Sequence, residues 1–240
     1  MRPFFILYIC YMINHVRNTV LTILNKENRG FLTPAQFNSY AKYAQQLIFD
    51  DYFNELEKYQ TLDNNRRLHG GTADIKNRLE QKIEKFVKVA TASEVSGYYT
   101  QPTDLYKIQS LTYNGKTIEH IAPHEEAYLS LSNIAGPSEE YPAYCIQNSY
   151  IYVKPESLTD DIKITYVRKP SDPKWTYQTI GENPIYNPSA SDHQDFELFA
   201  DDESRLITEI LKLTGLTIRE PQITQAGAGL EQAEEQRDNV

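Results

Sequence analysis

The sequence predicts an α+β fold: a helical bundle with an inserted small antiparallel β domain and an extended C-terminal tail. Apolar residues recur at helical spacing before residue 92 and again after residue 191. Between these segments, residues 94–195 hold 12 of the 18 tyrosines, 9 of the 12 prolines and the only tryptophan, a composition typical of short strands and turns. Residues 217–240 are polar, small and acidic, so they cannot form a core of their own.

The predicted organisation has five parts. These are an N-terminal extension (1–11), a helical part (12–92), a tyrosine- and proline-rich antiparallel β part (93–190), a helix that closes the helical part (191–216) and a C-terminal docking tail (217–240). The apolar run in the extension is too short to span a bilayer, and no small-residue cleavage site follows it. We interpret it as a segment upstream of a start at Met12; a signal or anchor, or an ordinary core segment, are the alternatives.

Three helices are predicted in the helical part. The first covers residues 13–24. The second begins at "LTPAQF", where Thr33 suits the N-cap and Pro34 the first helical position, and continues to about Tyr59. Its apolar stripe is wide, which predicts packing on two sides. The third covers residues 73–87.

The β part is expected to form a small sheet or barrel of about five strands. The predicted strands are Leu105–Tyr113, Ala127–Leu131, Ala143–Ile146, Tyr150–Lys154 and Ile162–Arg168. The sequence "YNGK" at residues 113–116 predicts a hairpin, because Asn-Gly accepts the positive φ angles of a type I′ turn.

The closing helix is predicted over residues 191–216. Ser191 or Asp192 can cap it, and the acidic residues that follow suit the positive end of a helix. Gly215 is a suitable C-terminal stop, with Leu216 folding back on the last turn.

No stretch of the sequence has the spacing of a catalytic, metal or cofactor site. His120 and His124 are four residues apart, but Pro123 lies between them. The carboxylates of residues 192–203 lack the glycine and the ligand alternation of a calcium loop, and "LHGGTAD" lacks the lysine of a phosphate loop. We therefore expect a protein that is not an enzyme and holds no cofactor.

Charge and cysteine content narrow the function classes further. The net charge of −9 disfavours sequence-independent nucleic-acid binding, which needs a basic surface. Basic residues exceed acidic ones by 13 to 9 in residues 1–92, whereas acidic residues prevail by 14 to 7 in residues 93–195 and by 10 to 4 in residues 196–240. Cys10 and Cys145 form neither a disulfide framework nor a metal motif, which fits synthesis in a reducing compartment.

Three stretches resemble structural proteins of tailed phages, notably the crAss-like phages and their relatives. Residues 16–60, "VRNTVLTILNKENRGFLTPAQFNSYAKYAQQLIFDDYFNELEKYQ", resemble the start of such proteins. Residues 144–175, "YCIQNSYIYVKPESLTDDIKITYVRKPSDPKW", resemble the sheet of their head-to-tail connectors. Residues 195–236 resemble their closing helix and Gln-rich tail. The order of the three stretches, spread over about residues 12–236, is more specific than any one of them.

The resemblance implies a ring, expected to be dodecameric, between the portal and the tail of the virion, assembled in the host cytoplasm. It implies three kinds of partner: further copies of the chain, the portal and the next tail ring, with genomic DNA passing through the channel and no membrane bound. The expected contact residues fall in three groups: Leu216, Ile218, Pro221, Ile223 and Leu230 for docking of the tail; Phe37, Tyr40 and Phe53 between subunits; and Tyr166, Arg168 and Trp175 toward the next ring.

Three other functions are alternatives. A tail stopper or nozzle-layer protein would occupy another place in the same virion. A virion-associated hydrolase would use the carboxylates between Asp192 and Glu203, with Asp195 as the residue to test. A carbohydrate-binding module would be built on Trp175 and its neighbouring tyrosines.

Overall fold

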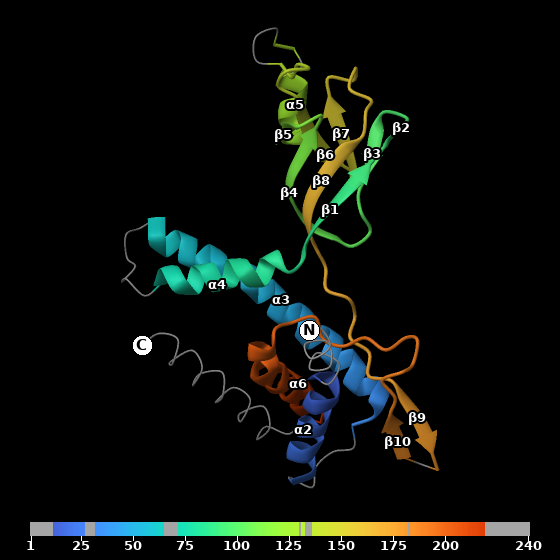
Figure 1. Ribbon diagram of the computed structural model, residues 1–240. Helices are drawn as coiled ribbons and strands as arrows, with labels where there is room; N and C mark the ends of the chain where they lie inside the picture. The colour runs from blue at the N-terminus through green and yellow to red at the C-terminus, as the bar shows by residue number, and fades with distance from the viewer. Residues whose placement is uncertain are drawn as a thin grey trace, which may run out of the picture. The chain divides into compact units, whose positions relative to one another are not determined.

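The computed structural model in Figure 1 describes residues 12–26, 32–64, 72–129, 131–132, 136–181 and 183–218. Within these residues the chain divides into two compact units. The helical unit comprises the segment up to Leu79 together with the segment from Pro170 onward, and the sheet unit comprises residues 80–169. The boundary after Leu79 falls inside helix α4 (Thr72–Glu84). The first and last parts of the chain therefore fold together, and the sheet unit is inserted between them.

Among the described residues, the helical unit contains helices α2 (Met12–Lys26), α3 (Pro34–Asn64) and α6 (Glu203–Ile218), the first turns of α4, the 3₁₀ turn η1 (Ala200–Asp202) and a hairpin of β9 (Tyr177–Ile180) and β10 (Asn183–Tyr186). Both α2 and α3 contact α6. Buried residues recur every three or four positions along each helix, as an amphipathic helix requires; they include Val16, Val20 and Leu24 in α2, Phe37, Ala41 and Ile48 in α3, and Leu206 and Ile210 in α6.

The N-terminus of α3 is capped as the sequence predicts. The Gln36 backbone N–H donates to Thr33 Oγ1 at 3.2 Å, and the Thr33 backbone N–H donates to Gln36 Oε1 at 3.0 Å. This reciprocal pair is a capping box, which satisfies two otherwise unpaired backbone donors. Thr33 as N-cap and Pro34 as first helical residue are both confirmed.

The sheet unit is an eight-stranded mixed sheet. Its strands are β1 (Val87–Ala92), β2 (Glu94–Val95), β3 (Tyr98–Thr100), β4 (Leu105–Tyr113), β5 (Lys116–His120), β6 (Ala143–Gln147), β7 (Tyr150–Lys154) and β8 (Ile162–Arg168). They lie in the order β1-β8-β4-β5-β6-β7-β3-β2, and only the β5–β6 pair is parallel. The two outermost strands, β1 and β2, are separated in sequence by Ser93 alone, so the sheet curls until its ends meet at one bend of the chain (Figure 1).

One apolar core fills the inside of this curl. It takes residues from β3, β4, β5, β6, β7 and β8 and from the loop before β8, namely Tyr99, Leu111, Tyr113, Ile118, Tyr144, Ile151, Val153, Leu158, Ile162, Ile164 and Tyr166. Side chains alternate between the two faces along β7: Ile151 and Val153 point into the core, and Tyr150 and Tyr152 do not. A second, smaller cluster lies on the other face, where α5 (Pro123–Leu129) contacts β6.

The predicted fold class, a helical bundle with a small inserted antiparallel domain, is wrong. The sheet is neither small nor purely antiparallel: it has eight strands, and β5 pairs in parallel with β6. Strands β1, β2, β3 and β5 were not expected, because short strands carry little periodicity of their own. β1 pairs with β8, β2 with β3, β3 with β7, and β5 with β4 and β6, and this pairing is what makes them strands.

Two predicted elements are also corrected. The strand expected at Ala127–Leu131 is helix α5, because Pro123 occupies its first turn and the Ala122 backbone N–H donates to Glu125 Oε2 at 3.2 Å. The helix expected over residues 191–216 begins at Glu203, after η1, and continues through Gly215 to Ile218. Its expected cap residues are unused, and Gly215 does not end it.

The predicted turn at residues 113–116 is confirmed. Asn114 and Gly115 have φ angles of 47° and 81°, the positive values that a type I′ turn requires. This turn joins β4 to β5 and sets their register.

Candidate functional site

The contact residues expected on α3 lie mostly in the interior of the helical unit. Phe37 is fully buried, and Tyr40 and Phe53 are half-buried. The Phe53 ring makes an edge contact with Phe49 at 5.3 Å between centroids. The wide stripe of α3 is therefore used largely within one copy of the chain.

The residues expected to contact the next ring belong to different units. Tyr166 is buried in the sheet core, and its hydroxyl donates to Asp104 Oδ1 at 2.8 Å. Arg168 is half-buried in the sheet unit, with its guanidinium 5.5 Å from the centre of the Phe86 ring. Trp175, only 2% exposed, lies in the helical unit.

The residues expected to dock the tail are mostly outside the described residues. Leu216 and Ile218 belong to the last turn of α6. Pro221, Ile223 and Leu230 lie outside the described residues, as does the segment 1–11.

A surface that the sequence did not indicate is the β9–β10 hairpin. Directly opposed residues in an antiparallel pair share a face. The register Tyr177↔Tyr186 and Thr179↔Pro184 defines one face, and Gln178↔Ile185 and Ile180↔Asn183 define the other. On the second face Ile180 is 64% exposed and Ile185 48% exposed. We call this second face the isoleucine face.

The opposite face of the hairpin is fixed to the helical unit through Trp175. The Trp175 ring stacks with Tyr177 at 5.6 Å and with Tyr186 at 5.8 Å between centroids, with interplanar angles of 20° and 18°. The guanidinium of Arg17, from α2, lies 3.8 Å from the Trp175 ring centre. Aromatic stacking and a cation over an indole ring are each favourable by about 0.5–2 kcal/mol.

Hydrogen bonds fix the backbone and the indole of Trp175 as well. Its backbone N–H donates to Asn38 Oδ1 at 2.8 Å, and its backbone carbonyl accepts from Asn38 Nδ2 at 3.2 Å. The indole N–H donates to Asn14 Oδ1 at 3.1 Å. Side chains from α2 and α3 therefore set the position from which the hairpin leaves the helical unit. A two-stranded hairpin by itself is marginally stable in water, so this anchor is what keeps it in place.

A second group of exposed apolar side chains lies in the sheet unit. Tyr128, Leu131 and Tyr141 are 77%, 83% and 75% exposed, and all three belong to the segment between β5 and β6. Exposed apolar groups of this kind mark contact surfaces more often than chemical sites.

The carboxylates that could have served a hydrolase have structural roles. Asp195 Oδ1 accepts 2.8 Å hydrogen bonds from the backbone N–H groups of Ile13 and Phe196, so it caps α2 from a position far along the chain. Burial raises the pKa of Asp195, and the backbone donors oppose this shift. Asp202 Oδ2 accepts from the Tyr52 hydroxyl at 2.6 Å, inside the helical unit.

Two further kinds of reactive group can be assessed within the described residues, a thiol and possible metal ligands. The Cys145 thiol is buried, and burial raises its pKa to about 11, which keeps it a poor nucleophile. Among the described residues no three His, Cys, Asp or Glu side chains are grouped to hold a metal ion. None of the helices within the described ranges is long and apolar enough to cross a membrane.

Comparison with known proteins adds no relative. No family model matches the chain, and no curated protein matches it.

The hairpin could have been found from the sequence through one signal: "YQTIGENPIY", residues 177–186, alternates around a glycine at residue 181, whose φ is 64°. Its anchoring on Trp175 could not, because Asn14, Arg17 and Asn38 are far from it in sequence.

Proposed function

We propose that this chain is a non-enzymatic virion protein of a tailed phage that forms a ring in the head-to-tail connector, between the portal and the tail. The observation that carries the proposal is the isoleucine face: an uncharged, exposed apolar surface on a hairpin that the helical unit holds in place through Trp175. The resemblance of three ordered stretches to connector proteins supplies the virion context.

The hairpin suits the contact between neighbouring subunits. Rings are closed by heterologous contacts, in which one surface of a subunit binds a different surface of the next. A projecting hairpin on one copy and a separate acceptor on its neighbour satisfy this requirement. Burying Ile180 and Ile185 would contribute about 1.5–3 kcal/mol each at full burial, and a closed ring adds such contacts at every interface.

The acidic composition is consistent with a DNA channel. A net charge of −9 repels phosphates, which would let the genome pass without sequence-specific binding. The portal and the next tail ring are the other proposed partners, with the tail after residue 217 as the docking segment.

The experiment is mass photometry of the full chain and of the double variant Ile180→Asp/Ile185→Asp, alone and with a portal. We expect wild-type rings of the mass of about twelve copies, and monomers for the double variant, because two carboxylates cannot be buried in an apolar contact without a large desolvation cost. The matched control is Val89→Asp, in which an equally exposed valine (65%) of the sheet unit is changed. The proposal is contradicted if the wild-type chain stays monomeric and does not bind portal.

The acceptor surface can be identified in the same system. A photo-crosslinking amino acid at Gln178, on the isoleucine face beside Ile185, should capture a neighbouring copy. Capture of a different virion protein, with no link between copies, would place the chain in a stopper or nozzle layer instead. A glycan-binding module centred on Trp175 is not favoured, because that ring is only 2% exposed.

A further inference from the structure

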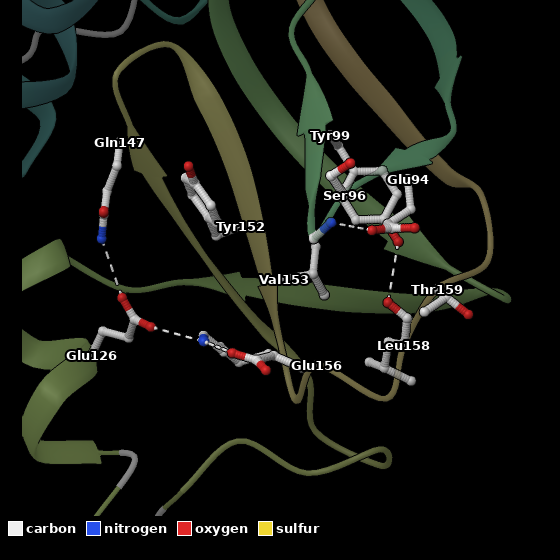
Figure 2. A pocket seen from close by; sticks show the side chains of 12 residues that line it. Glu94, Ser96, Tyr99, Glu126, Gln147, Tyr152, Val153, Glu156, Leu158 and Thr159 are labelled. Carbon is white, nitrogen blue, oxygen red and sulfur yellow. Dashed lines mark hydrogen bonds and ion pairs between the residues drawn. The ribbon is translucent and has the colours of Figure 1, made fainter.

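The sheet unit contains a cleft of about 540 Å³ that the connector function does not use. It lies between the β2–β3 turn on one side and the end of β7 with its following loop on the other (Figure 2). Its volume is within the range of small-molecule sites in proteins, about 300–1,000 Å³.

The strand pairing explains why the cleft is there. β3 pairs with β7 at two positions only, Tyr99↔Ile151 and Thr100↔Tyr150. β3 begins only at Tyr98, directly after the turn at Ser96 and Gly97 that joins it to β2, whereas β7 continues to Lys154. The last three residues of β7 therefore have no β3 neighbour, and the gap beside them is open. Tyr99 and Leu158 from the sheet core lie at its inner side.

A tyrosine ring lines the cleft and begins a row of three. Tyr152 lines the cleft and lies on the outer face of β7. Tyr98 is 6.3 Å from Tyr152 and 4.4 Å from Tyr150, measured between ring centroids. The three rings are neighbours on one face of the sheet, with the Tyr98 ring tilted by 54° from Tyr150 and by 55° from Tyr152. Such rings offer flat apolar area with a polar hydroxyl at one end.

Next to Tyr152 is a fixed set of polar groups. Glu126 Oε2 accepts from Gln147 Nε2 at 3.2 Å, and Glu126 Oε1 lies 3.3 Å from Lys154 Nζ. Lys154 Nζ also donates to Glu156 Oε1 at 2.7 Å (Figure 2). The Cys145 thiol donates to Glu126 at 3.3 Å beneath them. The contacts fix Glu126, Gln147 and Lys154 before any ligand arrives, which reduces the entropy lost on binding.

The chemistry of this lining selects the class of ligand. Three carboxylates, from Glu94, Glu126 and Glu156, and one ammonium group, from Lys154, line the cleft, so an anion such as a phosphate ester is disfavoured. Few apolar side chains line the cleft, so a hydrophobic ligand is disfavoured too. A neutral saccharide fits both conditions: its hydroxyls can donate to carboxylates and accept from the Gln147 amide and Lys154, and the C–H face of its ring can lie on Tyr152.

We propose that the sheet unit binds a neutral oligosaccharide, with one sugar ring in the cleft against Tyr152 and the next ring along Tyr98 and Tyr150. This activity does not depend on the ring proposed above. It would give a virion protein an affinity for surface glycans.

The test is saturation-transfer NMR on the full chain with maltotriose, cellotriose, chitotriose and mannotriose as probes, and spermidine as a cationic comparison. We expect transfer to at least one trisaccharide and a roughly tenfold weaker affinity for it in Gln147→Ala, the size of effect that losing one hydrogen bond to a ligand produces. Tyr152→Ala should abolish binding. Because Tyr152 also packs on the small outer cluster, circular dichroism must show that this variant folds.

The matched control is Tyr141→Ala, which removes a 75% exposed tyrosine elsewhere in the sheet unit and should leave binding unchanged. Equal binding by wild type and Gln147→Ala would overturn the proposal. So would transfer to spermidine alone, which would make the cleft a cation site, and so would no transfer to any of the four trisaccharides.

Discussion

The β9–β10 hairpin and the cleft of the sheet unit both present tyrosines and both lie beside tight turns, yet they offer opposite surfaces. The hairpin uses Tyr177 and Tyr186 inwardly, against Trp175, and exposes Ile180 and Ile185. At the cleft, Tyr98 and Tyr152 are half-buried and Tyr150 is 38% exposed, and the charged side chains of the lining lie near Tyr152. The rings stacked in parallel on Trp175 anchor the hairpin, whereas we propose that the tilted rings beside hydrogen-bonding groups form a binding surface. The number of tyrosines in a segment does not distinguish the two roles.

The largest expected effect separates the two regions by stability. Trp175→Ala should destabilise the helical unit by about 3–5 kcal/mol, because a buried indole and its stacking partners are lost. Urea denaturation followed by circular dichroism measures this. Ring assembly should fall with it, whereas trisaccharide binding by the sheet unit should persist. Loss of trisaccharide binding in Trp175→Ala would contradict the independence of the two regions.

Alkaline pH should act on the sheet unit first, because the pKa is raised for four of its tyrosines (Tyr99, Tyr113, Tyr144 and Tyr166), whereas in the described part of the helical unit the pKa is raised for Tyr52. Burial raises the pKa of Tyr99 and of Tyr166 to about 12 each. Because the folded pKa exceeds the unfolded value of about 10, both groups contribute stability that is present below pH 10 and is lost as the pH rises through 12. Tyr166→Phe should reduce this loss.

Trp175 fluorescence makes the order of events visible. It is the only tryptophan and lies in the helical unit, so its emission reports that unit alone. On raising the pH, circular dichroism of the strands should change before this emission does. Simultaneous changes would show that the two units unfold as one and would contradict this prediction.

A pair of glycine substitutions sharpens the comparison at the turns. Gly97, at the rim of the cleft, and Gly181, at the tip of the hairpin, have φ angles of 89° and 64°, and no atom lies within 4 Å of an added Cβ at either position. Each Gly→Ala change should therefore cost only the backbone strain of a left-handed residue, about 1–2 kcal/mol. We expect Gly97→Ala to weaken trisaccharide binding and Gly181→Ala to weaken assembly, measured by NMR and mass photometry. If Gly97→Ala weakened assembly and Gly181→Ala weakened trisaccharide binding instead, the assignment of the two functions to these two regions would be wrong.

The smallest effect on stability is expected from removing residues 221–240. The truncated chain should unfold within about 0.5 kcal/mol of the full chain, because this polar and acidic segment has few apolar side chains to bury. Portal binding should nevertheless be lost if this segment docks as the resemblance implies. Undiminished portal binding by the truncated chain would move the docking role to another part of the protein.

Much of the local structure could be predicted from the sequence. The strands Leu105–Tyr113, Tyr150–Lys154 and Ile162–Arg168 were predicted to the residue, because each alternates over five or more positions between clear turn signals. The capping residues Thr33 and Pro34 and the turn at Asn114–Gly115 were also correct. In each case the cause lies within a few residues of its effect.

Features that depend on partners far away in the chain could not be predicted from the local sequence. β2 and β5 are strands because β3, β4 and β6 pair with them, and β1 because it pairs with β8. Asp195 caps a helix 182 residues away instead of starting its own. Trp175 was expected on a surface and is buried, because Asn14, Arg17 and Asn38 close around it.

The amino-acid order alone therefore set helices α2, α3 and α4, strands β4, β7 and β8, the turn at Asn114–Gly115 and the acidic charge, since each follows from short-range backbone preference and side-chain periodicity. Folding set the size of the sheet, the cleft beside β7 and the exposed face of the hairpin. These come from pairing between segments far apart in the chain, and the free energy of such pairing leaves no local pattern to recognise.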